Sequence, residues 1–180
     1  SGAQNGTTPG CTGCTTNASS FFFNEATQAY VSYPTPVTGS NTDPLVSGRG
    51  YSVYFRHNLS GNVTLDYTGT HPATGANISL PVAATTGNFS LVGNPYPAPL
   101  LWSTTGWNRT GVSDFVSITD NVSVILRVFD INEGDGVITT GQAFWIETTG
   151  ATPVLEVNEN AKTSTQSSGG IFFRTGETLE

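Results

Sequence analysis

Apolar residues in this chain occur in short runs, separated by clusters of Gly, Pro, Asn and Asp. Within several runs, apolar and polar residues alternate, which places one set of side chains inward and the other toward solvent. This pattern predicts strands, and the frequent Gly and Pro disfavour long helices. The expected strands comprise residues 20–24, 29–33, 50–57, 62–67, 77–82, 88–92, 115–119, 122–130, 142–148, 153–158 and 170–174.

The segments between these strands indicate how neighbouring strands are connected. Residues 59–62 and 119–121 carry Ser, Gly, Asn and Asp, which suit tight hairpin turns. The run 122–130 is apolar in both of its alternating sets, so we expect a central strand there. Residues 99–110 form the one stretch that could hold a helical turn.

About ten or eleven short strands at this spacing predict an all-β fold, an antiparallel β-sandwich with jelly-roll or Greek-key connections. Residues 1–19 are rich in Gly and Thr and are expected to form an N-terminal loop segment. Residues 20–180 are expected to form a single β-sandwich module, since no linker divides them.

Composition narrows the possible partners. Charged residues make up only 11% of the 180 residues, less than half of the usual share of about 25%. Short hydroxyl and amide side chains supply the polarity instead, as on many extracellular β proteins. The net charge of −7 argues against nucleic acid, which requires a basic patch. No run of apolar residues is long enough for a membrane span, so no membrane insertion is expected.

Two cysteines, Cys11 and Cys14, lie close together in a Thr/Gly-rich stretch. A local disulfide is the preferred interpretation because the chain has the composition of a secreted protein. The alternatives are a redox pair, a metal site and two free thiols. A redox pair should open a helix after a strand, and a zinc site requires a second Cys/His pair at suitable spacing.

An acidic loop follows the run 122–130. Oxygen-bearing side chains lie at alternating positions there, with a Gly that allows a sharp turn, which resembles the chemistry of a calcium loop but not the spacing of an EF-hand. The alternative is an Asp/Gly-rich turn whose side chains cap their own backbone. No cofactor is required by the sequence, and Ca²⁺ is the one candidate. Its expected ligands are Asp130, Asn132, Glu133 and Asp135.

The sequence contains no recognisable arrangement of a nucleophile and a base. The two histidines, His57 and His71, belong to no serine, cysteine or metal motif. We therefore expect a chain that is not an enzyme.

Five segments in order resemble one known module. They are GRGYSVYFR at 48–56, YTGT at 67–70, LVGNPYP at 91–97, ITTGQAFWI at 138–146 and a closing pair, ENAKT at 159–163 and FFR at 172–174. Together they resemble a β module of large secreted and surface proteins of Bacteroidota. The resemblance covers nearly the whole chain from Phe21 to Arg174.

The resemblance implies a location more firmly than an activity. Proteins with this module are exported by the type IX secretion system and are associated with adhesins and polysaccharide-degrading exoproteins. It therefore implies an extracellular or cell-surface fragment, joined to other domains of a parent protein. The C-terminal sorting domain of such proteins is not visible in this sequence.

Aromatic residues near the LVGNPYP segment are the candidate ligand site. Trp102 and Trp107 lie five residues apart in a Ser/Thr-rich stretch, and Tyr96 lies between prolines that fix the backbone. Exposed rings with polar neighbours hold sugars in many β modules. The alternative is that these rings are part of the core, as we expect for Trp145. The expected ligand-binding residues are Tyr96, Trp102, Trp107, Asn108 and Arg109.

These observations favour a non-catalytic module that serves adhesion or carbohydrate binding, with a polysaccharide or surface glycan as partner. The competing hypothesis is a structural spacer that supports export and has no ligand. The two hypotheses differ on Trp102 and Trp107, because exposed, coplanar rings favour binding and buried rings favour the spacer.

Overall fold

The computed structural model describes residues 20–33, 44–53, 69–70, 74–120, 125–132 and 136–165. These residues form an all-β fold whose strands pair antiparallel, as the sequence predicts. They contain no α-helix, and one short 3₁₀ helix, η1 (Glu159–Ala161), follows the last strand. The predicted loop at 1–19, the cysteines Cys11 and Cys14, both histidines and the predicted strands 62–67 and 170–174 lie outside the described residues.

A four-stranded sheet occupies the middle of the fold. Its order is β5-β11-β8-β9, built from β5 (Phe89–Gly93), β11 (Ala143–Thr148), β8 (Val112–Asp120) and β9 (Ile125–Asp130). Its two faces differ, because side chains alternate across a strand. In β11, Phe144 and Ile146 point into the core, while Trp145 points to the opposite face, which we call the outer face.

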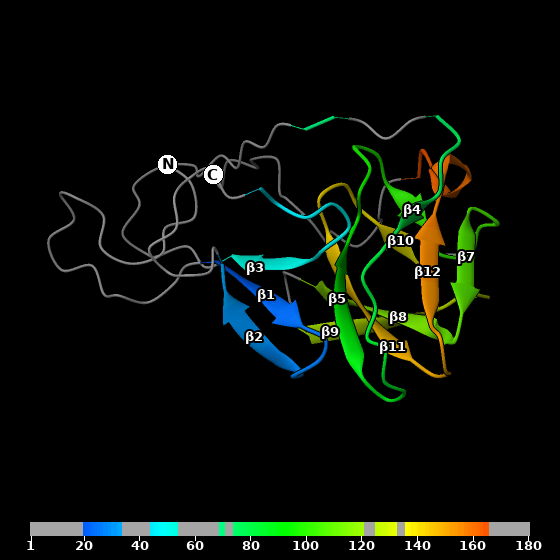
Figure 1. The fold of residues 1–180 in the computed structure, drawn as a ribbon. Coiled ribbons are helices and arrows are strands. Elements are labelled where there is room, and N and C mark those ends of the chain that lie inside the picture. The colour runs from blue at the N-terminus through cyan, green and yellow to red at the C-terminus, as the bar shows by residue number, and fades with distance from the viewer. Residues whose placement is uncertain are drawn as a thin grey trace, which may run out of the picture.

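Two further layers cover this sheet (Figure 1). The sheet β4-β12-β7 lies on the core side, with β4 (Ile78–Ser79), β12 (Val154–Val157) and β7 (Trp107–Thr110). A two-stranded pair, β10 (Val137–Ile138) and β6 (Leu100–Leu101), adds to the core. The sheet β2-β1-β3 lies on the outer face, with β1 (Ser20–Asn24), β2 (Ala29–Ser32) and β3 (Tyr51–Val53).

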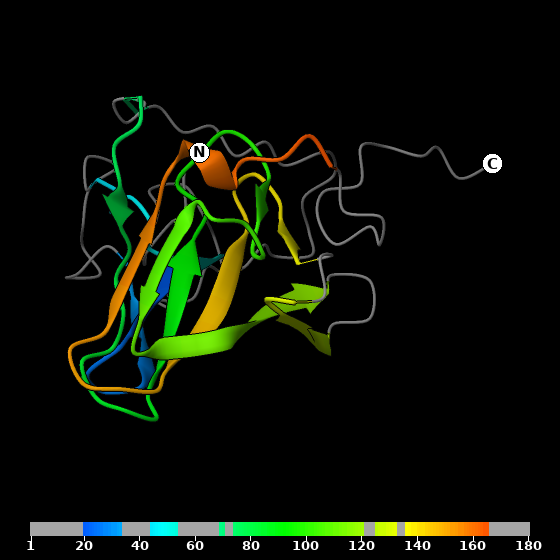
Figure 2. The same cartoon turned by 90° about the vertical axis from the view of Figure 1, so that its right-hand side faces the viewer.

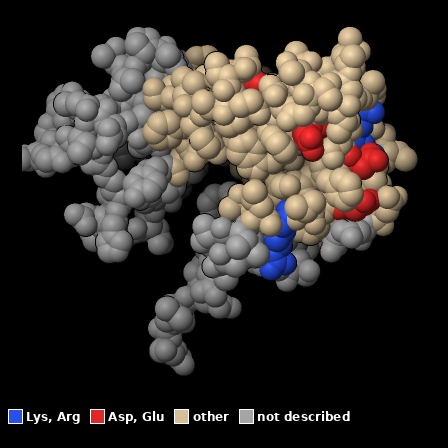
Figure 3. Space-filling view, turned by 90° about the horizontal axis from the view of Figure 1, so that it is seen from below, with Lys and Arg blue, Asp and Glu red and all other residues tan. Residues whose placement is uncertain are grey.

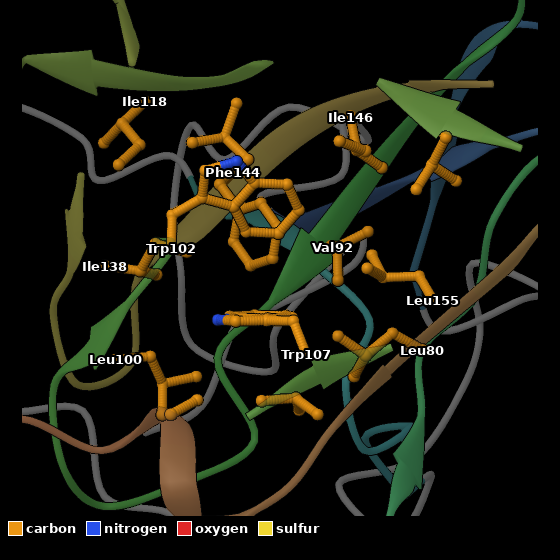
Figure 4. Close-up of a cluster of buried hydrophobic side chains, with 14 of the residues drawn as sticks. Leu80, Val92, Leu100, Trp102, Trp107, Ile118, Ile138, Phe144, Ile146 and Leu155 are labelled. Carbon is orange, nitrogen blue, oxygen red and sulfur yellow. The ribbon is translucent and has the colours of Figure 1, made fainter. Parts of the chain in front are cut away.

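The buried core lies between the four-stranded sheet and β4-β12-β7 (Figure 4). Its largest members are fully buried aromatic and aliphatic side chains contributed by nearly every strand of the two sheets. Burial of such side chains stabilises each by roughly 1.5–3 kcal/mol. The central members are Leu80, Val92, Leu100, Trp102, Trp107, Ile118, Ile138, Phe144, Ile146 and Leu155.

One sequence-based expectation about an individual strand is wrong. Among the described strands, β9 is not central but lies at the end of its sheet. The side chains of β9 are apolar on both faces of the strand. Phe129 on one face is buried in the core, whereas Leu126 and Val128 on the other are exposed on the outer face. Residues 99–110 hold no helical turn. They contain β6 and β7, whose intervening turn brings two tryptophans into the core.

Other expectations are confirmed. Strand β1 has the predicted bounds, and β8 pairs with β9 as a hairpin, although Thr119 and Asp120, which were predicted to lie in its turn, belong to β8. Figure 2 shows this hairpin, lime and olive, extending beyond the other described strands. The position of the hairpin leaves part of the outer face without a covering strand among the described residues.

Candidate functional site

The side chain of Asn94, within the LVGNPYP segment, connects its own turn to a distant part of the chain. Its amide nitrogen donates to the carbonyl oxygens of Ala98 at 2.9 Å, Thr139 at 3.0 Å and Ile138 at 3.3 Å. Its Oδ1 accepts from the backbone N–H of Tyr96 at 2.9 Å. One side-chain amide therefore hydrogen-bonds backbone groups of its own proline-rich turn and of the β10–β11 connection. An asparagine is required because only an amide offers both donors and an acceptor on one short side chain.

The glycines of the GRGYSVYFR segment lie directly against the same turn. The N–H of Gly93 donates to the carbonyl of Gly48, and the N–H of Gly50 donates to that of Leu91, both at 2.9 Å. A Cβ on Gly93 would lie 2.7 Å from the carbonyl oxygen of Arg49. The close backbone approach explains why glycine occupies this position.

The ITTGQAFWI segment contributes a second side-chain amide. Gln142 is buried, and its Oε1 accepts from the N–H of Thr139 at 2.9 Å and from the Thr139 hydroxyl at 3.0 Å. The carbonyl of Gln142 accepts from the N–H of Asn94 at 3.0 Å. Asn94 and Gln142 therefore hold the two turns against each other.

The ENAKT segment also contacts the proline-rich turn at residues 94–99. The Nζ of Lys162 lies 4.6 Å from the centroid of the Tyr96 ring and 2.8 Å from Oε1 of Glu159. The N–H of Thr163 donates to the carbonyl of Pro99 at 3.0 Å. Burial, and then the negative charge of Glu159, raise the pKa of the Tyr96 hydroxyl. Tyr96 is thus covered rather than presented to a ligand.

Four of the segments that carry the resemblance therefore meet around residues 91–99. Their contacts are mainly hydrogen bonds to backbone atoms and ring packing. The residue types at these positions are explained by the folding of the turn, so the segment has a structural role.

The tryptophans that the sequence suggested as a sugar platform are buried. Trp102 is 0% exposed and Trp107 is 7% exposed. Their ring centroids are 4.8 Å apart with an interplanar angle of 63°, so the rings are not coplanar (Figure 4). The expectation of exposed, coplanar rings is therefore wrong for Trp102 and Trp107, and Tyr96 is buried as well. The turn between β6 and β7 is short enough that both indoles pack on Phe144.

Both indole nitrogens are satisfied inside the fold. Nε1 of Trp102 donates to the carbonyl of Asp114 at 2.7 Å, and Nε1 of Trp107 donates to the carbonyl of Leu101 at 2.9 Å. Burying an indole costs little when its N–H has a partner. The bond from Trp102 also joins the β6–β7 turn to β8, and the bond from Trp107 joins β7 to β6.

We expect Trp107→Phe to destabilise the protein rather than to alter binding. The substitution keeps an aromatic ring in the core but removes the donor to Leu101 and part of the buried volume. The expected loss is about 2 kcal/mol of the free energy of unfolding. Urea denaturation measures it, and an unchanged midpoint with unchanged slope would contradict the buried position.

The two polar candidates beside these rings differ from each other. The guanidinium of Arg109 lies 4.7 Å from the Trp102 ring centroid, and its Nη1 donates to the Trp102 carbonyl at 2.7 Å. Burial lowers the pKa of Arg109, while the nearby Asp114 acts to raise it. Asn108 is exposed and donates to Oε2 of Glu156 at 2.9 Å. Arg109 is thus occupied within the fold, and only Asn108 remains at the surface.

The candidate calcium loop is only partly described. Oδ1 of Asp130 accepts from both the backbone N–H and the side-chain nitrogen of Asn132, each at 2.7 Å. These local bonds match the alternative of an acidic turn that caps its own backbone. The other two expected ligands, Glu133 and Asp135, lie outside the described residues. Within the described residues, no group of three or more His, Cys, Asp or Glu side chains could hold a metal ion.

The outer face contains a shallow apolar hollow that sequence reasoning did not identify. It is lined by Phe23, Phe89, Ser117, Leu126 and Trp145. Trp145, expected in the core, instead lies half-buried on this face, where Phe23 contacts it edge-on at 4.8 Å between centroids. The alternation of side chains along β11 indicates this position, because Phe144 and Ile146 face the core and Trp145, between them, therefore faces the opposite side.

Comparisons with known proteins add no relative. No family model, no curated protein and no solved structure matches the chain. Among the described residues, no helix has the length and apolar character needed to cross a membrane.

Proposed function

We propose that this chain is a non-catalytic structural module of an extracellular multidomain protein, one that spaces or supports other domains and holds no ligand of its own. The observation that carries this proposal is the burial of Tyr96, Trp102 and Trp107 in the core. The residues that the sequence offered for sugar binding are used to stabilise the fold. The extracellular location rests on the composition and on the resemblance to secreted Bacteroidota modules.

The chemistry of the described surface supports this proposal. A glycan site requires exposed rings with polar groups positioned to bind hydroxyls. Around Trp102 the polar groups are already engaged: Arg109 bonds a backbone carbonyl, and Asn108 bonds Glu156. A spacer requires only a stable fold, and the network centred on Asn94 provides one.

A panel of neutral polysaccharides tests the proposal. We expect no saturable binding by isothermal titration, and no difference between the wild-type chain and Asn108→Ala. A Ca²⁺ titration should likewise leave the melting temperature unchanged. Saturable binding that Asn108→Ala removes would contradict the proposal and restore a glycan site beside β7.

Glycan binding at a different place is the second candidate function. Its supporting observation is the half-exposed Phe89 and Tyr30 beside Trp145 on the outer face. In this case Phe89→Ala would abolish saturable binding, whereas Asn108→Ala would preserve it. The two variants therefore separate a site on the outer face from one beside β7.

A further inference from the structure

The hollow on the outer face lies between two β layers. Trp145 and Ser117 come from neighbouring strands of the four-stranded sheet, Phe23 comes from β1, and Leu126 comes from the edge strand β9. Seen from below, the surface is hollowed between two tan regions, and the acidic side chains in view gather away from it (Figure 3). The hollow is therefore apolar and carries no acidic or basic residue in its lining.

The β8–β9 hairpin on the same face carries exposed apolar side chains. Leu126 is 55% exposed, Val128 is 57% exposed and Phe115 is 51% exposed. Leu126 and Val128 are paired with Thr119 and Ser117, so they share the face of the hollow. An edge strand normally carries lysine, proline or a bulge that prevents pairing with another chain. Strand β9 contains neither lysine nor proline, and its charged residues are Arg127 and Asp130.

The hollow and the exposed apolar side chains of the β8–β9 hairpin lie on the same face of the four-stranded sheet. This shared position indicates a second copy of the chain as the partner. A two-fold axis would place the projecting β8–β9 hairpin of each copy over the hollow of the other, so that each contact occurs twice. We propose that this chain self-associates through its outer face as a two-fold dimer. The contact would extend the packing that already exists, in which Phe23 and Tyr30 of the β1–β2 layer lie edge-on to Trp145.

The lining of the hollow favours protein over glycan. Ser117 is its single polar residue, whereas a sugar ring would require several partners for its hydroxyls. The net charge of −7 would oppose self-association if the contact were acidic. The lining of the hollow is uncharged, and the carboxylates of this face lie at its border, where Glu147 is paired with Phe89 and Asp130 with Phe115.

The exposed apolar area limits the size of the dimer interface. Five half-exposed side chains on each copy, at about 100 Å² each, give on the order of 1,000 Å² for the pair. This is near the lower limit of a specific interface, so we expect a reversible dimer with a Kd of roughly 10–500 μM. The five side chains are Tyr30, Phe89, Phe115, Leu126 and Val128.

Sedimentation velocity of the full chain from about 5 to 500 μM tests the proposal. We expect the weight-average mass to rise toward that of a dimer, and Val128→Asp to weaken the Kd at least tenfold. Val154→Asp is the matched control, because it places the same change at an exposed position of a strand in another sheet, and its Kd should equal the wild type's.

Leu126→Asp provides an independent variant, and the melting temperature of each variant verifies its fold. A mass that stays monomeric throughout would overturn the proposal. Equal weakening by Val128→Asp and Val154→Asp would also overturn it, since the contact would then lie elsewhere. A monomeric chain whose polysaccharide binding is lost in Leu126→Asp would assign the hollow to a glycan instead. The sedimentation results do not depend on whether the module serves as a spacer, whereas polysaccharide binding would also contradict the spacer proposal.

Discussion

Asn94→Asp is expected to lower the free energy of unfolding by about 3–5 kcal/mol. The substitution hardly changes the shape of the side chain, but it replaces the amide donors with a carboxylate oxygen. That oxygen would lie about 3 Å from the carbonyl oxygens of Ala98 and Thr139 and close to that of Ile138. Three backbone acceptors would lose their partner and face a negative charge. For a chain of this length, the loss corresponds to a decrease of about 10 °C or more in Tm.

The stability of Asn94→Asp should also depend on pH. The neighbouring carbonyl oxygens favour the protonated acid, so the folded state raises the pKa of the new carboxyl above its unfolded value. A raised folded pKa gives stability that is present at low pH and is lost as pH rises through that pKa. The difference in stability between variant and wild type should therefore narrow in acid. Urea denaturation at several pH values measures this narrowing.

Asn160→Asp is the matched control for this prediction. Asn160 is exposed in η1, and its backbone N–H donates to the side chain of Asn158, so the same change there meets no carbonyl cluster. We expect its effect to stay within about 0.5 kcal/mol. If both variants lost the same stability, the position of Asn94 at the centre of the network would be wrong.

Gly106→Ala is expected to have an effect of similar size. A Cβ at this position would lie 2.1 Å from the backbone nitrogen of Ala161 and 2.6 Å from the carbonyl carbon of Asn160. These are backbone atoms of η1, and the carbonyl of Gly106 accepts from the N–H of Asn158 at 2.9 Å. The β6–β7 turn and η1 would have to separate, which opens the core beside Trp107. We expect a loss of more than about 3 kcal/mol.

Gly69→Ala separates this clash from the general effect of replacing glycine. A Cβ on Gly69 meets no atom within 4 Å, so the change should stay within about 0.5 kcal/mol. Differential scanning calorimetry of both variants measures the difference in Tm. Equal melting temperatures for Gly106→Ala and the wild type would mean that η1 does not pack against the turn.

The sequence specified the strands well where one face of a strand is buried. The bounds of β1 match the prediction, β11 differs from it by one residue at one end, and β12 differs by one residue at each end. The alternation of apolar and polar residues predicts these strands correctly, because a buried face requires apolar residues at every second position. It failed for β9, because Leu126 and Val128 are apolar without being buried. A pattern of apolar residues cannot distinguish an exposed apolar face from a core.

The candidate site was less predictable than the fold. Residues 91–97 were recognised as a distinctive segment, but Asn94 was not identified as its most connected side chain. Its hydrogen-bond partners Ile138 and Thr139 lie more than forty positions away in the chain. Such partners become visible only when the β10–β11 connection is placed against the proline-rich turn.

The sequence by itself determined an all-β chain of short antiparallel strands, because alternation and Gly/Pro-rich turns act between neighbours in the chain. The tertiary structure decided which aromatic residues are covered. Trp102 and Trp107 resemble surface residues in their Ser/Thr-rich context, yet the β6–β7 turn carries them into the core. Trp145 has the context of a core strand, yet it lies on the outer face. Burial depends on which sheet packs on each face, and that packing joins residues far apart in the chain.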